Sequence, residues 1–183
     1  TGLVVTVLTL IAAQWAVVNV SLRTLTEQYF ASRLAHDSEG LSVRMVFDRD
    51  GRPIVAEGRV DPLFTRPFSG HYFRIDFSDS HWRSRSLWDQ ELPLLQHPGL
   101  HSNLQLGPGG QRLLILRSDY RRLGQSISIS VAQDYTPVSD SFQRMRQIGL
   151  GLGLAALLLI LFLQRLTVRR ALKPLERGRG QIA

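Results

Sequence analysis

The segment 148-IGLGLGLAALLLILFL-163 contains sixteen apolar residues and no charge. A helix that crosses the hydrocarbon core of a bilayer needs roughly 20 mostly apolar residues. Arg165 and Leu166 can extend the segment at its C-terminal end, because the aliphatic part of an arginine lies along apolar surface while its charge reaches water. A buried core helix of a soluble protein is the alternative. The segment predicts a transmembrane helix over residues 147–166.

A second uncharged stretch, residues 1–22, is long enough to span a bilayer without extension. A cleaved signal peptide is the alternative, but the apolar stretch is longer than a signal peptide's and no basic segment precedes it. Because the sequence begins inside the apolar run, we expect further residues upstream. Two transmembrane helices would place both chain ends on one side of the membrane and residues 23–146 on the other.

The distribution of charge supports this topology. Residues 23–146 contain sixteen Arg and fourteen acidic residues, whereas residues 147–183 contain five Arg and one Lys against Glu176 alone. Basic residues next to a transmembrane helix mark its cytoplasmic end, although Arg144 and Arg146 also precede the second helix. The high isoelectric point therefore belongs mostly to the tail, and we expect no nucleic-acid partner. The absence of cysteine is compatible with a bacterial periplasm.

Residues 23–146 have the periodicities of a mixed helical and sheet domain. Apolar residues at three- and four-residue steps predict a helix that leaves the first span and stops near Gly40. Alternating apolar and polar residues predict strands over 41–48, 54–58, 71–77, 82–88, 111–120 and 126–134. Residues 89–103 are predicted to be a loop, and Thr136 and Pro137 suit the start of a helix that leads into the second span. The predicted fold class is α+β: an antiparallel sheet flanked by helices, between two transmembrane helices.

The tail, residues 167–183, begins with apolar residues at four- and three-residue spacing, including Leu172 and Leu175. Pro174 lies inside this pattern, where proline removes a backbone donor and bends a helix. The motif from Arg170 to Leu175, Arg-x-x-x-Pro-Leu, resembles the beginning of a HAMP linker. That resemblance implies a homodimer in which Leu172, Pro174 and Leu175 relay a signal to a cytoplasmic output domain. Because the chain stops inside this motif, we expect a longer parent protein.

The middle of the chain contains three further motifs, 69-SGHYFRI-75, 84-SRSLWDQEL-92 and 132-AQDYTPV-138. They resemble the periplasmic region of bacterial two-component sensor histidine kinases, a PAS-like sensor of the PhoQ-DcuS-CitA type. The resemblance implies a multi-pass protein of the bacterial inner membrane that senses an unknown periplasmic ligand or protein. It also implies a parent kinase that uses ATP and Mg²⁺ and phosphorylates a cytoplasmic response regulator.

The chain itself offers no constellation for catalysis. A nucleophile with a base and an orienting group is missing, so we predict no catalytic residue and no cofactor in these residues. His97 and His101 are weak metal-ligand candidates, because Pro98 and Gly99 between them break the helix that would bring them together. A surface loop is the alternative for these histidines.

The candidates for ligand sensing are three arginines and a tryptophan. Arg83 and Arg85 are expected on one face of the same strand, where they could meet Arg74 or Arg117 across the sheet and hold an anionic ligand. Pairing of these arginines with nearby Asp and Glu residues is the alternative. Trp88 is a candidate for the ligand site or for the core.

Gly149 and Gly153 form a Gly-x-x-x-Gly motif in the second span, and this spacing permits close contact between helices. They are therefore candidates for the dimer contact. The predicted function is the sensing and transmembrane-signalling part of a sensor histidine kinase. The alternatives are the sensor region of a chemoreceptor or diguanylate cyclase, and a membrane-anchored periplasmic binding or scaffold protein.

Overall fold

The computed structural model describes residues 2–47, 53–55, 60–77, 80–122 and 124–177, with only the backbone for residues 2–4, 47, 53–55, 103–106 and 168–177. The chain divides into two units. The sheet unit is Ser21–Ser139, and the span unit combines Thr1–Val20 with Asp140–Ala183.

Helix α1 covers Gly2–Arg44 and therefore runs past the predicted stop at Gly40. The prediction of a strand over 41–48 was wrong for its first half, and only Met45–Phe47 forms strand β1, which pairs with β2, Pro53–Val55. Continuing the helix keeps Leu41 on the same buried face as Leu34. The burial of Leu41 offsets the cost of about 1 kcal/mol for a glycine inside a helix.

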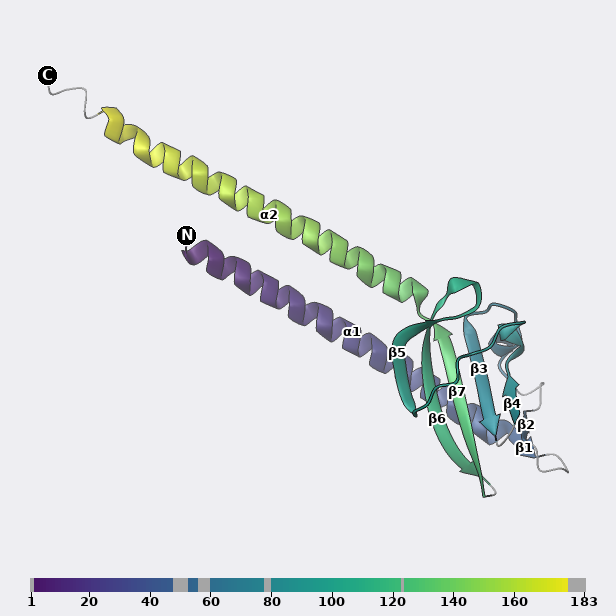
Figure 1. The fold of residues 1–183 in the computed structure, drawn as a ribbon. Helices are drawn as coiled ribbons and strands as arrows, with labels where there is room; N and C mark the ends of the chain where they lie inside the picture. The colour runs from purple at the N-terminus through teal and green to yellow at the C-terminus, as the bar shows by residue number, and fades with distance from the viewer. Residues whose placement is uncertain (1, 48–52, 56–59, 78–79, 123, 178–183) are drawn as a thin grey trace. The chain divides into compact units, whose positions relative to one another are not determined.

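The main sheet has five antiparallel strands, in the order β4-β3-β7-β6-β5 (Figure 1). Their bounds are His71–Phe77 for β3, Ser80–Arg83 for β4, Gly99–Leu106 for β5, Arg112–Arg122 for β6 and Gln125–Asp134 for β7. The α+β fold class is confirmed, and the predicted strand over 71–77 matches β3. The predicted strand over 82–88 was wrong beyond Arg83, because the chain turns into a short 3₁₀ helix, η3, over Arg85–Leu87. The predicted loop 89–103 likewise ends early, at the start of β5.

The two faces of this sheet bury separate apolar clusters. One face packs against α1, with Phe73, Ile75 and Ile129 of the sheet against Leu34 and Leu41 of the helix. The other face holds a smaller cluster: Tyr72, Leu87, Leu92, Leu95, Leu113, Ile115 and Ala132. This second cluster includes residues from outside the sheet, so an additional segment must cover that face.

Helix α2 covers Thr136–Arg177. Thr136 does not cap the helix as predicted: its hydroxyl accepts a hydrogen bond from the backbone N–H of Arg112 on β6 (2.7 Å). The N–H of Thr136 is instead capped by Oδ1 of Asp134, at 2.8 Å. The beginning of α2 is therefore tied directly to the sheet.

Both long helices contain apolar segments long enough to cross a membrane. None of the residues in the most apolar window of either helix is buried inside the chain. A core helix of a soluble protein would bury this surface, so the exposed apolar segments suit a lipid environment.

Candidate functional site

The strap, which we define as residues 88–98, crosses one face of the main sheet. It must do so because β4 and β5, the strands that it helps to join, lie at opposite edges of the sheet. Leu92 and Leu95 point into the smaller apolar cluster and are buried, whereas Trp88 and Leu94 are each 65% exposed. Leu92 and Leu95 thus fasten the strap to the sheet by apolar contact.

Three arginines lie in one row across the sheet beneath the strap. Arg83 of β4 pairs with Arg74 of β3, Arg74 pairs with Ser130 of β7, and Ser130 pairs with Arg117 of β6. Directly paired residues of neighbouring strands project from the same face, so all three guanidinium groups reach toward the strap. We call Arg74, Arg83 and Arg117 the arginine row.

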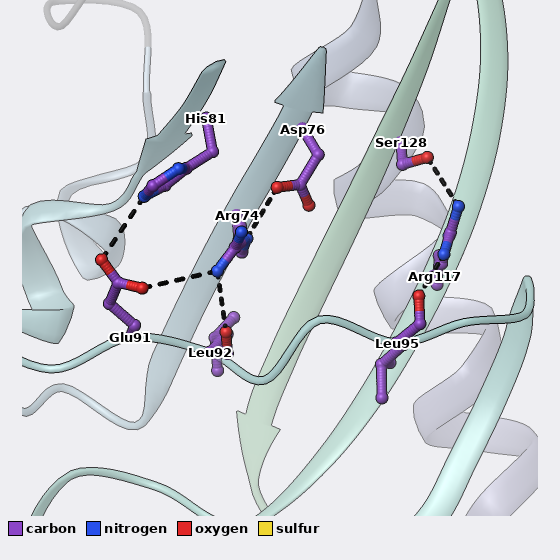
Figure 2. Close-up of polar contacts among 8 residues, drawn as sticks. All are labelled: Arg74, Asp76, His81, Glu91, Leu92, Leu95, Arg117 and Ser128. Carbon is purple, nitrogen blue, oxygen red and sulfur yellow. Dashed lines mark hydrogen bonds and ion pairs between the residues drawn. The ribbon is translucent and has the colours of Figure 1, made fainter. Parts of the chain in front are cut away.

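Arg74 joins the strap to a carboxylate on the sheet (Figure 2). Its Nη1 donates to the backbone carbonyl of Leu92 at 3.1 Å, and its Nε donates to Oδ1 of Asp76 at 2.8 Å. Nη1 also lies 3.6 Å from Oε2 of Glu91, whose other oxygen is 3.4 Å from Nε2 of His81. The Arg74 side chain is 13% exposed, whereas that of Glu91 is 57% exposed. Asp76 is therefore the stronger partner, because exposed ion pairs contribute little.

Arg117 likewise joins the strap to the sheet, and Figure 2 shows it between Leu95 and Ser128. Its Nη1 donates to the carbonyl of Leu95, its Nη2 to Oγ of Ser128 at 2.9 Å, and its Nε to Oδ1 of Asp119 at 2.9 Å. Burial raises the pKa of the Asp119 carboxyl, but hydrogen bonds from Arg117 and Ser128 outweigh it, so the net pKa lies below its usual range.

Arg83, the third member of the row, donates from Nη1 to the carbonyl of Gln90. The arginine row therefore binds the strap at three successive points, Gln90, Leu92 and Leu95, and every acceptor is a backbone carbonyl. A charged donor gives a stronger hydrogen bond than a neutral one. These hydrogen bonds fix the path of the strap's backbone, and they do not depend on which side chains the strap carries.

Trp88 begins the strap in a conformation that usually belongs to glycine. Its φ is 57° and its ψ is −108°, and the carbonyl of Leu87 accepts a hydrogen bond from the N–H of Gln90 at 3.0 Å. This is a type II′ turn with Trp88 at the first central position, where φ is positive and glycine is normal. A bulky residue there carries backbone strain.

The structure brings two of the four predicted sensing residues together. Arg74 on β3 and Arg83 on β4 are neighbours in the arginine row, but Arg85 lies outside the sheet, because it begins η3. Trp88 is neither buried in the core nor part of an aromatic cage. The alternative of acidic partners is confirmed for Arg74, which contacts Asp76 and Glu91.

A small cavity lies beside Arg83 and Arg85. It has a volume of about 20 Å³, and its other lining residues are Val60, Phe64, Thr65, Phe73, Trp82 and Ser84. That volume holds about one water molecule, whereas pockets for small ligands measure roughly 300–1,000 Å³. A small-molecule stimulus would not fit in this cavity without rearrangement.

The weak metal candidates do not converge on a site. His101 lies on β5, and its Nε2 is 2.8 Å from the backbone carbonyl of His97. Within the part of the chain that the structure describes, no group of three His, Cys, Asp or Glu side chains is arranged to hold a metal ion.

The glycines of the second span have different surroundings within the span unit. A Cβ on Gly149 would lie only 2.6 Å from Nε1 of Trp15, so glycine is needed where α2 meets this indole. A Cβ on Gly153 would meet nothing within 4 Å. Gly149 thus serves a contact inside the chain, while a dimer contact remains a prediction. The relay candidates Leu172, Pro174 and Leu175 all lie on the helical backbone of α2.

Comparison with known proteins gives one informative similarity. The chain is 52% identical over 156 residues to a protein named "Sensor protein kinase CarS" from Pseudomonas aeruginosa. The match covers 85% of this chain and 35% of that protein, so the chain spans about a third of its relative's length. No family model and no solved structure matches the chain. The similarity supports the sequence-based interpretation of the chain as the sensor portion of a two-component histidine kinase.

Proposed function

We propose that this chain is the signal-sensing and transmembrane-signalling portion of a two-component sensor histidine kinase in a bacterial inner membrane. The observation that carries the proposal is the 52% identity to a sensor protein kinase over 85% of the chain. The fold agrees with it, since a sheet unit is joined at both ends to helices that contain membrane-length apolar segments.

In this proposal the sheet unit lies in the periplasm and is a PAS-like sensor. The support is the five-stranded antiparallel sheet that packs one face against α1. Basic residues concentrated in the tail favour a cytoplasmic position for both chain ends. The tail from residue 167 onward would begin a HAMP linker within a homodimer.

The whole protein would bind ATP and Mg²⁺, phosphorylate a histidine and pass the phosphoryl group to a response regulator. A stimulus drives such a system only if it interacts more favourably with one of two conformations of the sensor. The exposed strap and the arginine row below it are the part of the sheet unit best placed to differ between conformations.

The test is phosphorylation of the full-length parent protein in membrane vesicles. Incubation with ATP labelled at the γ-phosphate should give a protein-bound label that survives alkali and is lost in acid, as expected for phosphohistidine. Transfer to a co-expressed response regulator should follow. Synthesis of a cyclic dinucleotide, or no label under any stimulus, would instead favour the cyclase, chemoreceptor or scaffold alternatives.

A further inference from the structure

We infer that the strap, residues 88–98, is a releasable element of the sensor, and that its detachment from the arginine row is transmitted to the first turn of α2. This inference rests on the proposed function and names the moving part within it. Four features of the sheet unit support it: the fastening of the strap, its two ends, the apolar cluster beneath it, and the hydrogen bonds at the start of α2.

The fastening suits an element that can detach without unfolding the sheet. The strap contributes only Leu92 and Leu95 to the buried cluster, and the other core of the sheet, against α1, includes no residue of the strap. Its other ties to the sheet are polar. Arg74, Arg83 and Arg117 donate hydrogen bonds to its carbonyls, the exposed Glu91 contacts Arg74 and His81, and the carbonyl of His97 contacts His101. Water can replace the arginines as donors to those carbonyls when the strap lifts.

Both ends of the strap have hinge-like backbone. Trp88 occupies the glycine position of a type II′ turn, and Gly99, the residue after the strap, has a φ of +121°. Strain at a residue such as Trp88 persists only while its surroundings hold it in place. Release of the strap would relieve that strain, which brings the attached and detached states closer in energy.

The buried side of the strap leads to α2 through strand β6. Leu92 and Leu95 share the smaller apolar cluster with Leu113. The preceding residue, Arg112, donates its N–H to Oγ1 of Thr136 and its Nη1 to Oγ of Ser139, at 2.7 and 2.6 Å. Its carbonyl accepts the N–H of Tyr135 at 2.8 Å.

Because packed side chains shift together, removing two leucines from this cluster would alter the support of Leu113. The backbone of Arg112 would then move relative to the residues that it holds at the start of α2. Helix α2 continues from there into the apolar segment of the second span. The strap is therefore placed to change how the sheet holds the signalling helix.

The test uses the whole chain in lipid nanodiscs and exploits its lack of cysteine. The thiol of a Leu95→Cys variant is buried while the strap is attached, so its alkylation rate reports detachment. Leu94→Cys, at an exposed position, serves as the matched control for the intrinsic reaction rate. Arg117→Gln should accelerate alkylation at position 95 about tenfold or more and leave position 94 unchanged.

Two further variants keep the inference falsifiable. Arg121→Gln removes an exposed arginine of the same strand and should change neither rate. Trp88→Gly places the preferred residue in the II′ turn and should slow alkylation at position 95 severalfold, without threatening the fold. If neither Arg117→Gln nor Trp88→Gly changes the rate at position 95, the strap is not a releasable element.

Transmission is read from amide hydrogen exchange of residues 136–142 in the same samples. Arg117→Gln should speed exchange there, and Trp88→Gly should slow it. Faster alkylation at position 95 with unchanged exchange at 136–142 would overturn the link to α2. Neither measurement needs ATP or a response regulator, so failure of this inference is distinguishable from failure of the proposed kinase function.

Discussion

Arg74→Met is the substitution that best tests the role of the arginine row in stability. Methionine keeps most of the apolar volume of the side chain but removes its hydrogen bonds to Asp76 and to the carbonyl of Leu92. The Asp76 carboxylate and the Leu92 carbonyl then both lack this donor. Hydrogen bonds to charged groups contribute about 1.5–3 kcal/mol each, and breaking a buried ion pair costs about 3–5 kcal/mol. Because Asp76 is 22% exposed, we expect less than the full cost of a buried ion pair. The expected loss in the free energy of unfolding is about 2–4 kcal/mol.

Arg83→Met is the matched comparison. Its hydrogen bond to the Gln90 carbonyl is exposed to solvent, so we expect a loss below about 1 kcal/mol. The assay is urea unfolding of the full chain in nanodiscs, followed by the fluorescence of Trp82, whose ring lies 5.3 Å from that of Phe73 in the larger core. Equal losses for Arg74→Met and Arg83→Met would refute the argument from burial.

Three further predictions concern other parts of the chain. Gly149→Leu should displace the Trp15 indole and shift its fluorescence, because a Cβ there would lie 2.6 Å from Nε1, whereas Gly153→Leu should leave that signal unchanged; equal shifts would contradict this. Burial raises the pKa of Asp37, only partly opposed by nearby basic groups, so the folded state binds its proton more tightly and ionisation weakens folding. Asp37→Asn should therefore raise the unfolding midpoint at pH 7, with no gain below the unfolded pKa of about 3.9; an equal gain at both pH values would disprove this cause. Pro174→Ala should change kinase output of the parent without affecting membrane insertion, and unaltered output across stimuli in a reporter strain would count against a relay role.

The sheet was predictable where one simple rule governs it. Residues 71–77 alternate because one face of β3 packs on α1, and a period of two in the sequence follows directly from the alternation of side chains across a strand. The prediction of a helix end near Gly40 was wrong for the opposite reason. A local stop signal there is weaker than the tertiary burial of Leu41, which the sequence alone does not reveal.

The site was predictable only in part. The charges of Arg74 and Arg83 drew attention to two residues of the arginine row, although their predicted role in ligand sensing stays a prediction, and carboxylate partners were the stated alternative. The attachment of the strap could not be predicted from the sequence, because its hydrogen-bond acceptors are backbone carbonyls. Every residue carries such a carbonyl, so no sequence motif marks these positions. Arg85 was misplaced because the pattern Trp-Arg-Ser-Arg-Ser imitates strand alternation beyond the residue where β4 ends. The II′ turn at Trp88 could not be foreseen, since glycine is the residue that signals it.

The central claim is that the chain crosses the membrane twice, with the sheet unit outside and the tail inside. The most direct measurement is labelling of intact cells with a membrane-impermeant thiol reagent, using single variants Leu94→Cys and Ala171→Cys of the cysteine-free chain. We predict that position 94 reacts in intact cells and that position 171 reacts only after lysis. Reaction of both positions from the same side of the membrane would contradict the account.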